Sequence, residues 1–385
     1  MIKLDPKCFT KNSWTKISIL NPVLDRYDSS SPHVRTLMDK MAKSGSTRFE
    51  LEHLDSNIDD VRNEMISFWR SVNSAVDSEY IRDITGYKGF HSCVLKMPGT
   101  KVSIRVLYPL ELPKPHEYIG TIVHVTATFL DMFPANSEHV DMFISLDMRS
   151  RDLDHSESSS IQSRFQHYKK KSTALNASGM TNRGRGVIFL TKTEEIVKLL
   201  FHELIHYAGL DNVLLGNNLD VPWDLSNKSL NTSEAYTEAL SIILTTMYQS
   251  FQYGNIKGIR PIDMFHYLMY LEQNYSIQMS ANVLYFYGYN NGNYREFFNS
   301  TKMKHSCPIH IFPYVLLRTF LLNKYVELIS ALGGDLKLTS RDIVSVHRLL
   351  KPTDEEITLV GKCLIDGSKY KNISYMVTEL DWAQI

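Results

Sequence analysis

The chain has 385 residues, of which 43% are hydrophobic and 22% are charged, a composition typical of a globular protein with a large core. Lys and Arg together number 42 and Asp and Glu also number 42, so the formal net charge is zero. This balance excludes a strong global field of either sign, and we expect neither a nucleic acid nor a membrane as a partner.

The first residues, Met1–Lys7, lack the apolar run of a secretory signal, and no run of about 18 apolar residues predicts a membrane-spanning helix. The four cysteines form no CxxC pair, so neither a disulfide scaffold nor a cysteine zinc site is expected. These features predict an intracellular, cytoplasmic protein. Abundant Tyr, Asn and Met are compatible with an AT-rich genome, such as that of a large virus. The sequence carries no signal for the oligomeric state.

The chain divides by pattern into three segments. Residues 1–90 are predicted to be a mostly helical N-terminal extension, because apolar residues recur at helical spacing from Ile58 to Val76. Residues 91–215 are predicted to be a sheet-containing lobe and residues 216–385 a helical lobe. The predicted strands are Val102–Leu107, Ile119–Thr128, Met142–Met148 and Gly186–Leu190, and the predicted helices are 196–208, 235–252, 262–272, 311–331 and 341–350.

This arrangement predicts an α+β fold in which a small mixed β-sheet and one central helix precede a mostly helical lobe. A long polar stretch, 149–185, separates two of the predicted strands and contains the basic run Lys169–Lys171. We expect a solvated loop there, because no wider basic surface supports nucleic-acid binding. Such a loop is also placed to form one wall of a cleft.

Residues 202–206 read His-Glu-Leu-Ile-His, and a chain of this composition would contain about 0.03 such matches by chance. On a helix, His202 and His206 lie on the same face, so both imidazoles can reach one metal ion. Glu203 then lies beside the ion, where its carboxylate can accept the proton of a metal-bound water. The motif therefore predicts a zinc (Zn2+) site with Glu203 as the catalytic base.

The flanking residues predict that this motif lies on a buried helix. Residues 191–194 read Thr-Lys-Thr-Glu, which fits a capping box with Thr191 as the N-cap residue. Apolar residues cover several sides of the helix, and Gly209 is a natural stop. The predicted strand Gly186–Leu190 comes directly before the helix, and an extended peptide is expected to pair with its edge.

A catalytic zinc ion usually has three protein ligands and one open position. Two carboxylates follow the motif on a second predicted helix, which begins near Asn231 or Thr232. Glu234 lies in the first turn of this helix, and Glu238 lies one turn further along the same face. One carboxylate is expected to bind zinc, while the other supports a ligand imidazole.

These residues resemble the gluzincin branch of the HExxH zinc metallopeptidases, on His202–His206 and on Ser233–Glu238, which reads Ser-Glu-Ala-Tyr-Thr-Glu. In that family the first Glu of such a helix is the third ligand, and the acid four residues later supports a ligand histidine. The resemblance thus assigns these roles to Glu234 and Glu238. It covers about residues 185–250, and it implies a zincin-like fold and zinc-dependent hydrolysis of a peptide or protein substrate.

Members of that family usually add a Tyr, His or Arg side chain that stabilises the oxyanion. The helical half offers several candidates, none of which the sequence singles out: Tyr285, Tyr287, Tyr289, His266, His305 and His310.

A competing resemblance is to the metzincin pattern HExxHxxGxxH. Gly209 matches that pattern, but Asn212 stands where the third ligand should be, and a neutral Asn is a poor zinc ligand. Asp211 lies one position too early. The comparison favours Glu234 as the third ligand.

Two functions from different classes follow from the motif. The first is a zinc metallopeptidase, a hydrolase that acts on peptide bonds. The alternative is a catalytically silent structural or binding protein that keeps a zincin fold. The intact His202, Glu203 and His206 favour the enzyme, because a silent protein need not keep the base.

Overall fold

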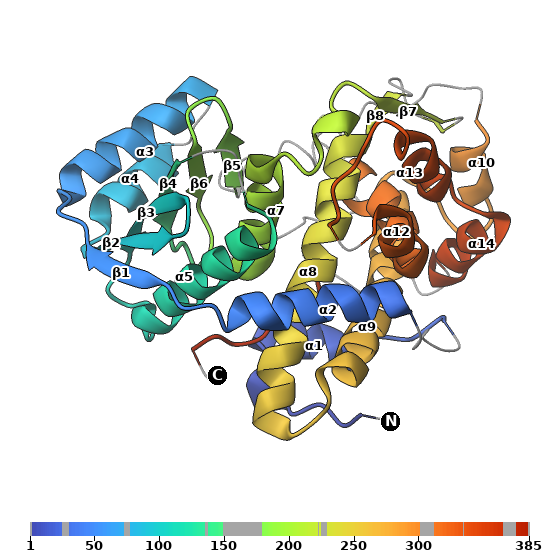
Figure 1. The fold of residues 1–385 in the computed structure, drawn as a ribbon. Helices are drawn as coiled ribbons and strands as arrows, with labels where there is room; N and C mark the ends of the chain where they lie inside the picture. Colours follow the sequence, from blue (N-terminus) through green and yellow to red (C-terminus); the bar gives the residue numbers. More distant parts are fainter. Residues whose placement is uncertain are drawn as a thin grey trace. The chain divides into compact units, whose positions relative to one another are not determined.

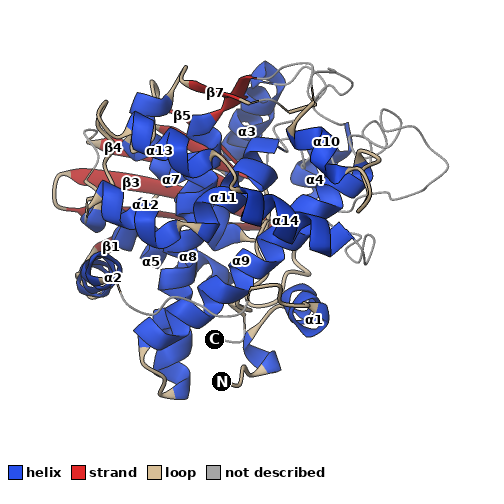
Figure 2. Cartoon of the chain, turned by 90° about the vertical axis from the view of Figure 1, so that its right-hand side faces the viewer, coloured by secondary structure: helices blue, strands red, loops and turns tan. Residues whose placement is uncertain are grey.

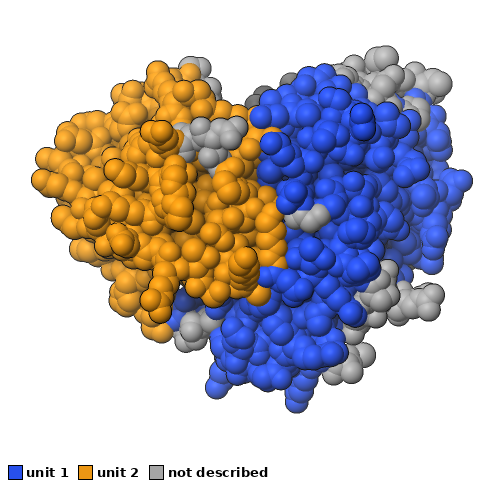
Figure 3. Space-filling model, in the orientation of Figure 1, with its two compact units in different colours: residues 1–39, 152–168, 210–385 blue, residues 40–151, 169–209 orange. Residues whose placement is uncertain are grey.

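The structure is a computed structural model of the chain, and it describes residues 2–24, 31–72, 78–134, 138–148, 179–221, 223–224, 229–300, 312–333, 335–364 and 375–383 (Figure 1). Contacts divide the chain into two compact units, coloured separately in Figure 3. Unit 1 comprises Met1–Asp39, Asp152–Tyr168 and Leu210–Ile385, and unit 2 comprises Lys40–Arg151 and Lys169–Gly209. Most of the polar stretch 149–185 lies outside the described residues.

Unit 2 contains the sheet. In chain order its elements are β1 (Glu50–His53), α3 (Ile58–Val72), α4 (Ser78–Gly86), β2 (Gly89–Met97), β3 (Thr100–Tyr108), α5 (Pro115–Met132), β4 (His139–Ser145), β5 (Gly179–Asn182), β6 (Val187–Leu190) and α7 (Ile196–Ala208). Helix α2 (Pro32–Gly45) crosses the boundary between the units. The first 90 residues therefore do not group together: residues 1–39 cluster with the helical unit, whereas β1, α3 and α4 are parts of the sheet-containing unit.

The described strands of unit 2 form one mixed sheet in the order β1-β2-β3-β4-β6-β5, drawn in red in Figure 2. β1, β2 and β3 pair antiparallel, β3, β4 and β6 pair parallel, and β5 pairs antiparallel with β6. The α+β class and the mixed sheet are thus confirmed. The expectation that Gly186–Leu190 offers a free edge is wrong, because this strand, β6, lies between β4 and β5. On this side of the sheet the edge strand is β5, and β1 forms the opposite edge.

The prediction of a strand at Ile119–Thr128 is also wrong, because these residues lie within the helix α5. β3 and β4 pair in parallel, and a parallel pair needs a crossover connection, which α5 supplies. Pro115 occupies the first turn of the helix, where its missing N–H costs nothing. The β-branched residues lower helix propensity by only a few tenths of a kcal/mol each, and their burial outweighs that loss.

The two faces of the sheet are covered by different helices (Figure 1). On one face, α3 and α4 pack over Phe143 and Phe189, which are paired across β4 and β6. The ring of Phe68 stacks on Phe189 with a centroid distance of 3.5 Å. On the other face, Thr126 of α5 contacts Met142 of β4, and Phe129 of α5 packs against α7. Helices α5 and α7 therefore pack together on this second face, where α7 is buried.

Unit 1 is mostly helical. Its elements are the 3-10 helices η1 (Pro6–Cys8) and η3 (Asn212–Leu214), the paired strands β7 (Asn218–Asp220) and β8 (Ser229–Asn231), the π-helix η4 (Phe312–Leu317), and the α-helices α1 (Lys11–Ile19), α8 (Thr232–Lys257), α9 (Pro261–Phe286), α10 (Tyr294–Phe298), α11 (Arg318–Asn323), α12 (Tyr325–Leu332), α13 (Ile343–Leu350) and α14 (Asp354–Cys363). Among the described residues, no helix is both long and apolar enough to cross a membrane.

Helices α8 and α9 form the centre of unit 1. α8 ends at Gly258, whose φ of 65° suits glycine, and α9 begins at Pro261. Most residues of both helices are buried, so each packs on several sides. The helix predicted at 262–272 extends in the structure to Phe286. Buried polar residues such as Glu272 and Asn274 interrupt the apolar spacing on which the prediction depended.

Glu272 gives unit 1 a predicted pH dependence. Burial raises the pKa of its carboxyl group from 4.5 to about 7, although hydrogen bonds from Thr378 and Val377 oppose the rise. Between these two pH values the folded chain binds more protons than the unfolded chain, so stability falls as the pH rises. We expect the Glu272→Gln variant to lack this fall, which amounts to at most about 3 kcal/mol. Urea unfolding at pH 5 and pH 8 measures it, and a slope that the substitution leaves unaltered would contradict the expectation.

Candidate metal centre

Helix α7 carries the His-Glu-Leu-Ile-His motif and is buried over most of its length. It begins at Ile196, after Glu195 in the left-handed region at φ 59°, and no side chain caps it. The predicted capping box is therefore wrong. Thr193 instead connects this segment to the residues that follow β4, since its N–H and its Oγ1 both donate to the Asp147 carbonyl at 2.9 Å. The predicted stop is confirmed, because Gly209 caps the helix at φ 67°.

The two motif histidines face one another across one turn of α7. Their Nε2 atoms lie 3.2 Å apart, and their rings meet nearly edge to face. Two nitrogens bound to a tetrahedral zinc ion at 2.0–2.1 Å would lie about 3.3–3.4 Å apart. The observed separation fits that requirement, and the chemistry of two imidazoles suits zinc. The two rings are hydrogen-bonded to each other in this structure, at a separation close to the one that a zinc ion would require.

Arg183, in the turn between β5 and β6, reaches the other nitrogen of His206. Its Nη2 lies 3.1 Å from Nδ1, and because a guanidinium only donates, Nδ1 accepts this hydrogen bond. A neutral imidazole that binds a metal through Nε2 carries its proton on Nδ1. Metal binding at Nε2 and the Arg183 hydrogen bond therefore exclude each other for a neutral ring.

Glu203 is buried, with 4% of its surface exposed, and it lies against the edge strand β5. Oγ1 of Thr181 donates toward Glu203, at 2.7 Å from Oε2 and 2.9 Å from the backbone carbonyl. Gly179 leaves room for the carboxylate, because a Cβ atom at this position would lie 2.5 Å from Oε1. Strand β5 thus acts on the Glu203 carboxylate in two ways. Thr181 holds it by a hydrogen bond, and Gly179 leaves the space that it occupies.

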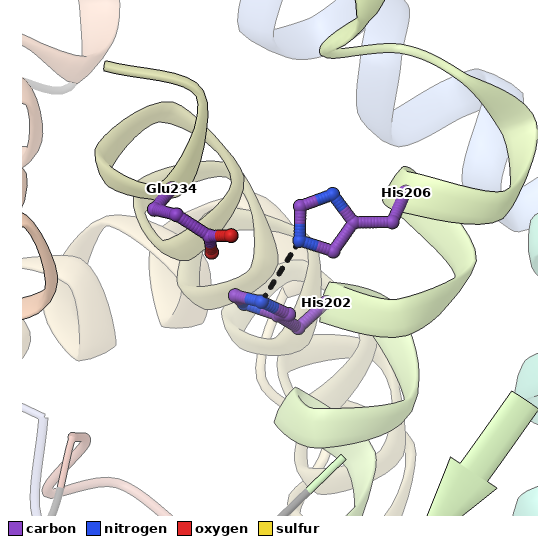
Figure 4. A group of neighbouring side chains, drawn as sticks. All are labelled: His202, His206 and Glu234. Atoms are coloured by element: carbon purple, nitrogen blue, oxygen red, sulfur yellow. Dashed lines mark hydrogen bonds between the residues drawn. The ribbon is translucent and has the colours of Figure 1, made fainter. Parts of the chain in front are cut away.

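Helix α8 carries the two acidic candidates. Asn231 is its N-cap, and the Asn231 side chain accepts a hydrogen bond from the Glu234 N–H at 3.2 Å, which confirms the predicted start. The ligand atoms of His202, His206 and Glu234 all lie within 4.8 Å of one another (Figure 4). Oη of Tyr314, from the π-helix η4, donates to Oε2 of Glu234 at 3.2 Å. This hydrogen bond orients the carboxylate.

Glu238, one turn further along α8, forms a buried ion pair. Nη1 of Arg318 lies 3.3 Å from Oε1 of Glu238, and the two side chains are 0% and 2% exposed. The same Nη1 donates to the Tyr375 carbonyl at 2.8 Å. The support of a ligand histidine by Glu238 remains a prediction.

The residues of the competing metzincin pattern have other contacts. Asp211 is buried and accepts a hydrogen bond from the Ser233 hydroxyl, which lies just before Glu234. The group of potential ligands found among the described residues contains Glu234 and neither Asp211 nor Asn212. The geometry thus favours Glu234 over the metzincin alternative.

Two of the possible oxyanion donors are hydrogen-bonded to other residues. Nδ1 of His266 lies 2.8 Å from the Tyr325 hydroxyl, and the Tyr289 hydroxyl donates to Asp224, both in buried positions. His305 and His310 lie outside the described residues. The sequence did not single out Tyr314, Arg183 or Thr181. Their contacts with Glu234, His206 and Glu203 span 80, 23 and 22 residues along the chain, so no local pattern reports them.

The described residues thus define an α+β protein in which a buried helix presents an HExxH motif. The chain belongs to the family of "Uncharacterized protein R210" from Acanthamoeba polyphaga mimivirus. It is 32% identical to that protein over 377 residues, which is 97% of this chain and 97% of the relative. No family model matches the sequence, and no solved structure matches it significantly.

Proposed function

We propose that this protein is a zinc metallopeptidase with a zincin-like fold. His202, His206 and Glu234 hold the zinc ion in this proposal. The separation of 3.2 Å between the two Nε2 atoms carries the proposal, because it matches two corners of a zinc tetrahedron. The proximity of the Glu234 carboxylate adds a third ligand of the right chemistry. This donor set leaves a fourth position open, as in catalytic rather than structural zinc sites.

A zinc ion in this site would act as a Lewis acid and would make a bound water acidic near neutral pH. Glu203 accepts a proton from the attacking water and passes it to the leaving amine. Thr181 keeps the carboxylate in one orientation for both transfers.

Digestion of a diverse peptide mixture, followed by mass spectrometry, tests this proposal. We expect new cleavage products with the wild-type protein, their loss after chelation, and their return when zinc is added. A protein that holds zinc but yields no product over prolonged incubation would support the alternative, a silent binding or structural protein. The substrate sequence found in this way serves the rate measurements below.

The Gly179→Ala variant is expected to hydrolyse this substrate about 100-fold more slowly and to keep its zinc. The new Cβ atom would lie 2.5 Å from Oε1 and 2.9 Å from Cγ of Glu203, so the carboxylate must move. A displacement of about 1 Å costs about 100-fold in rate. Gly184→Ala is the matched control on the same hairpin, because its nearest atom outside adjacent residues lies 3.7 Å away. Equal rates for the two variants would contradict the role of Gly179.

The Arg183→Met variant is expected to bind zinc about tenfold more tightly than the wild type. The substitution removes a charged hydrogen bond to Nδ1 of His206, worth about 1.5–3 kcal/mol, that zinc binding must break. It also removes a positive charge beside a divalent cation. Arg185→Met, on the same hairpin and exposed, serves as the control. Competition with a chromophoric chelator measures the affinity, and weaker zinc binding by the Arg183 variant would show that the arginine supports the site.

A further inference from the structure

The segment of residues 375–383, here called the 375–383 segment, lies inside unit 1 although it forms no helix. Most of its side chains are buried, with Val377, Thr378 and Leu380 at 0% exposure. Buried backbone needs hydrogen-bond partners, which an irregular segment must find in other elements. Its partners therefore show what the segment is built to contact.

Glu272 of α9 holds the middle of the 375–383 segment. Its carboxylate accepts the Val377 N–H at 2.9 Å, the Thr378 N–H at 2.7 Å and the Thr378 hydroxyl at 2.6 Å. Leu380 forms a β-bridge with Phe9, which fixes the far end. The position of the segment is thus determined by contacts that lie away from the metal ligands.

Tyr375, at the start of the segment, contacts two residues that each hold one of the acids of α8. Its carbonyl accepts the hydrogen bond from Arg318, and the same guanidinium nitrogen pairs with Glu238. Its ring meets the ring of Tyr314 edge to face, at a centroid distance of 6.0 Å and an angle of 73°. Tyr314 in turn donates to Glu234. Tyr375 is therefore connected to Glu238 through Arg318 and to Glu234 through Tyr314.

The π-helix η4 positions Tyr314, through which Tyr375 is connected to Glu234. Tyr314 lies within the six residues of η4, which continue directly into α11 and its first residue, Arg318. π-Helical turns are rare and frequently occur at functional sites. This turn places Tyr314 and Arg318 next to the same residue of the segment, Tyr375.

We propose that the 375–383 segment positions the acidic face of α8, through Tyr375, and thereby sets the affinity of the chain for zinc. The proposal rests on the zinc site proposed above. Tyr375 acts as a positioning residue, because its contacts are with Tyr314 and Arg318 and these contact the carboxylates. Loss of the Tyr375 ring frees Tyr314 to leave Glu234, so the third ligand becomes less ordered.

The experiment measures the zinc dissociation constant of the full chain and the visible spectrum of the cobalt-substituted protein. Partners that orient metal ligands contribute about 10–100-fold to metal affinity. We expect Tyr375→Ala to weaken zinc binding by about tenfold or more and to change the cobalt absorption bands, which report coordination geometry. Tyr375→Phe keeps the ring and is expected to behave like the wild type. Circular dichroism verifies that each variant is folded.

Folded Tyr375→Ala protein with wild-type zinc affinity and cobalt spectrum would overturn the proposal. If that variant fails to fold, Thr378→Val decides, because it removes the hydroxyl that contacts Glu272 and Gln249 and keeps the backbone N–H donors to Glu272. Weaker zinc binding by Thr378→Val would support the proposal, and unchanged binding would overturn it. A wild-type chain that binds neither zinc nor cobalt would instead overturn the proposed function, and this inference with it.

Discussion

Replacement of Glu203 by Gln is expected to slow peptide hydrolysis by about 100- to 10,000-fold and to leave the zinc content unchanged. Gln has the shape of Glu but cannot accept a proton at neutral pH. The Thr181 hydroxyl, 2.7 Å from Oε2, can still donate to an amide oxygen, so the side chain should keep its place. The change therefore removes the base and little else.

Rates on the substrate found by mass spectrometry, together with zinc content, measure this effect. Glu117→Gln is the matched control, because Glu117 is an exposed acid in the first turn of α5. Hydrolysis by the Glu203 variant at the wild-type rate would contradict the role of Glu203 as base. Loss of zinc together with activity would show that Glu203 instead maintains the site.

The Arg318→Met variant is expected to lose about 3–5 kcal/mol of stability, the largest loss among the substitutions considered. Arg318 and Glu238 are 0% and 2% exposed, and the substitution leaves the carboxylate buried without this cation. Breaking one partner of a buried ion pair typically has a cost of this size. Replacing both partners with apolar residues costs much less, because no charge then remains buried.

A double-mutant cycle separates the interaction energy of the Arg318–Glu238 ion pair from the packing contribution of each side chain. We expect Arg318→Met combined with Glu238→Leu to recover much of the stability that Arg318→Met alone loses, as measured by urea unfolding. Purely additive losses would show that the two side chains do not stabilise each other. The double variant also lacks the contact between Arg318 and Tyr375, so it should not recover full zinc affinity.

The sequence was informative where the signal is local. The strand Val102–Leu107, the first four residues of the predicted strand Met142–Met148 and the helix of the motif follow from apolar spacing. Asn231 and Gly209 follow from capping chemistry. The spacing of His202 and His206 by one turn is likewise a local property of a helix. These elements carry most of the proposed metal ligands.

The sequence was misleading where tertiary structure decides. The β-branched residues of α5 prefer a strand, but the parallel pairing of β3 and β4 requires a helix between them. Thr191 fits a capping box, but Thr193 is bound by Asp147, two residues after β4, and the helix begins later, at Ile196. The edge strand β5 is only four residues long and contains Gly179, which weakens its pattern.

The residues that contact the candidate ligands also could not be predicted from local sequence patterns. Arg183 and Tyr314 meet His206 and Glu234 only because the chain folds back. Nothing in the residues near Tyr314 marks a π-helical turn. A motif therefore predicts which residues bind a metal more readily than it predicts which residues orient them.

The central claim is that the chain holds one zinc ion through His202, His206 and Glu234. Elemental analysis of protein purified without added metal tests it, on the wild type and on the His206→Ala, Glu234→Ala and Glu238→Ala variants. We expect about one zinc per wild-type chain and its loss in the His206 and Glu234 variants. Loss in the Glu238 variant alone would move the third ligand one turn along α8. A wild-type chain that holds no zinc and takes none up would contradict the claim.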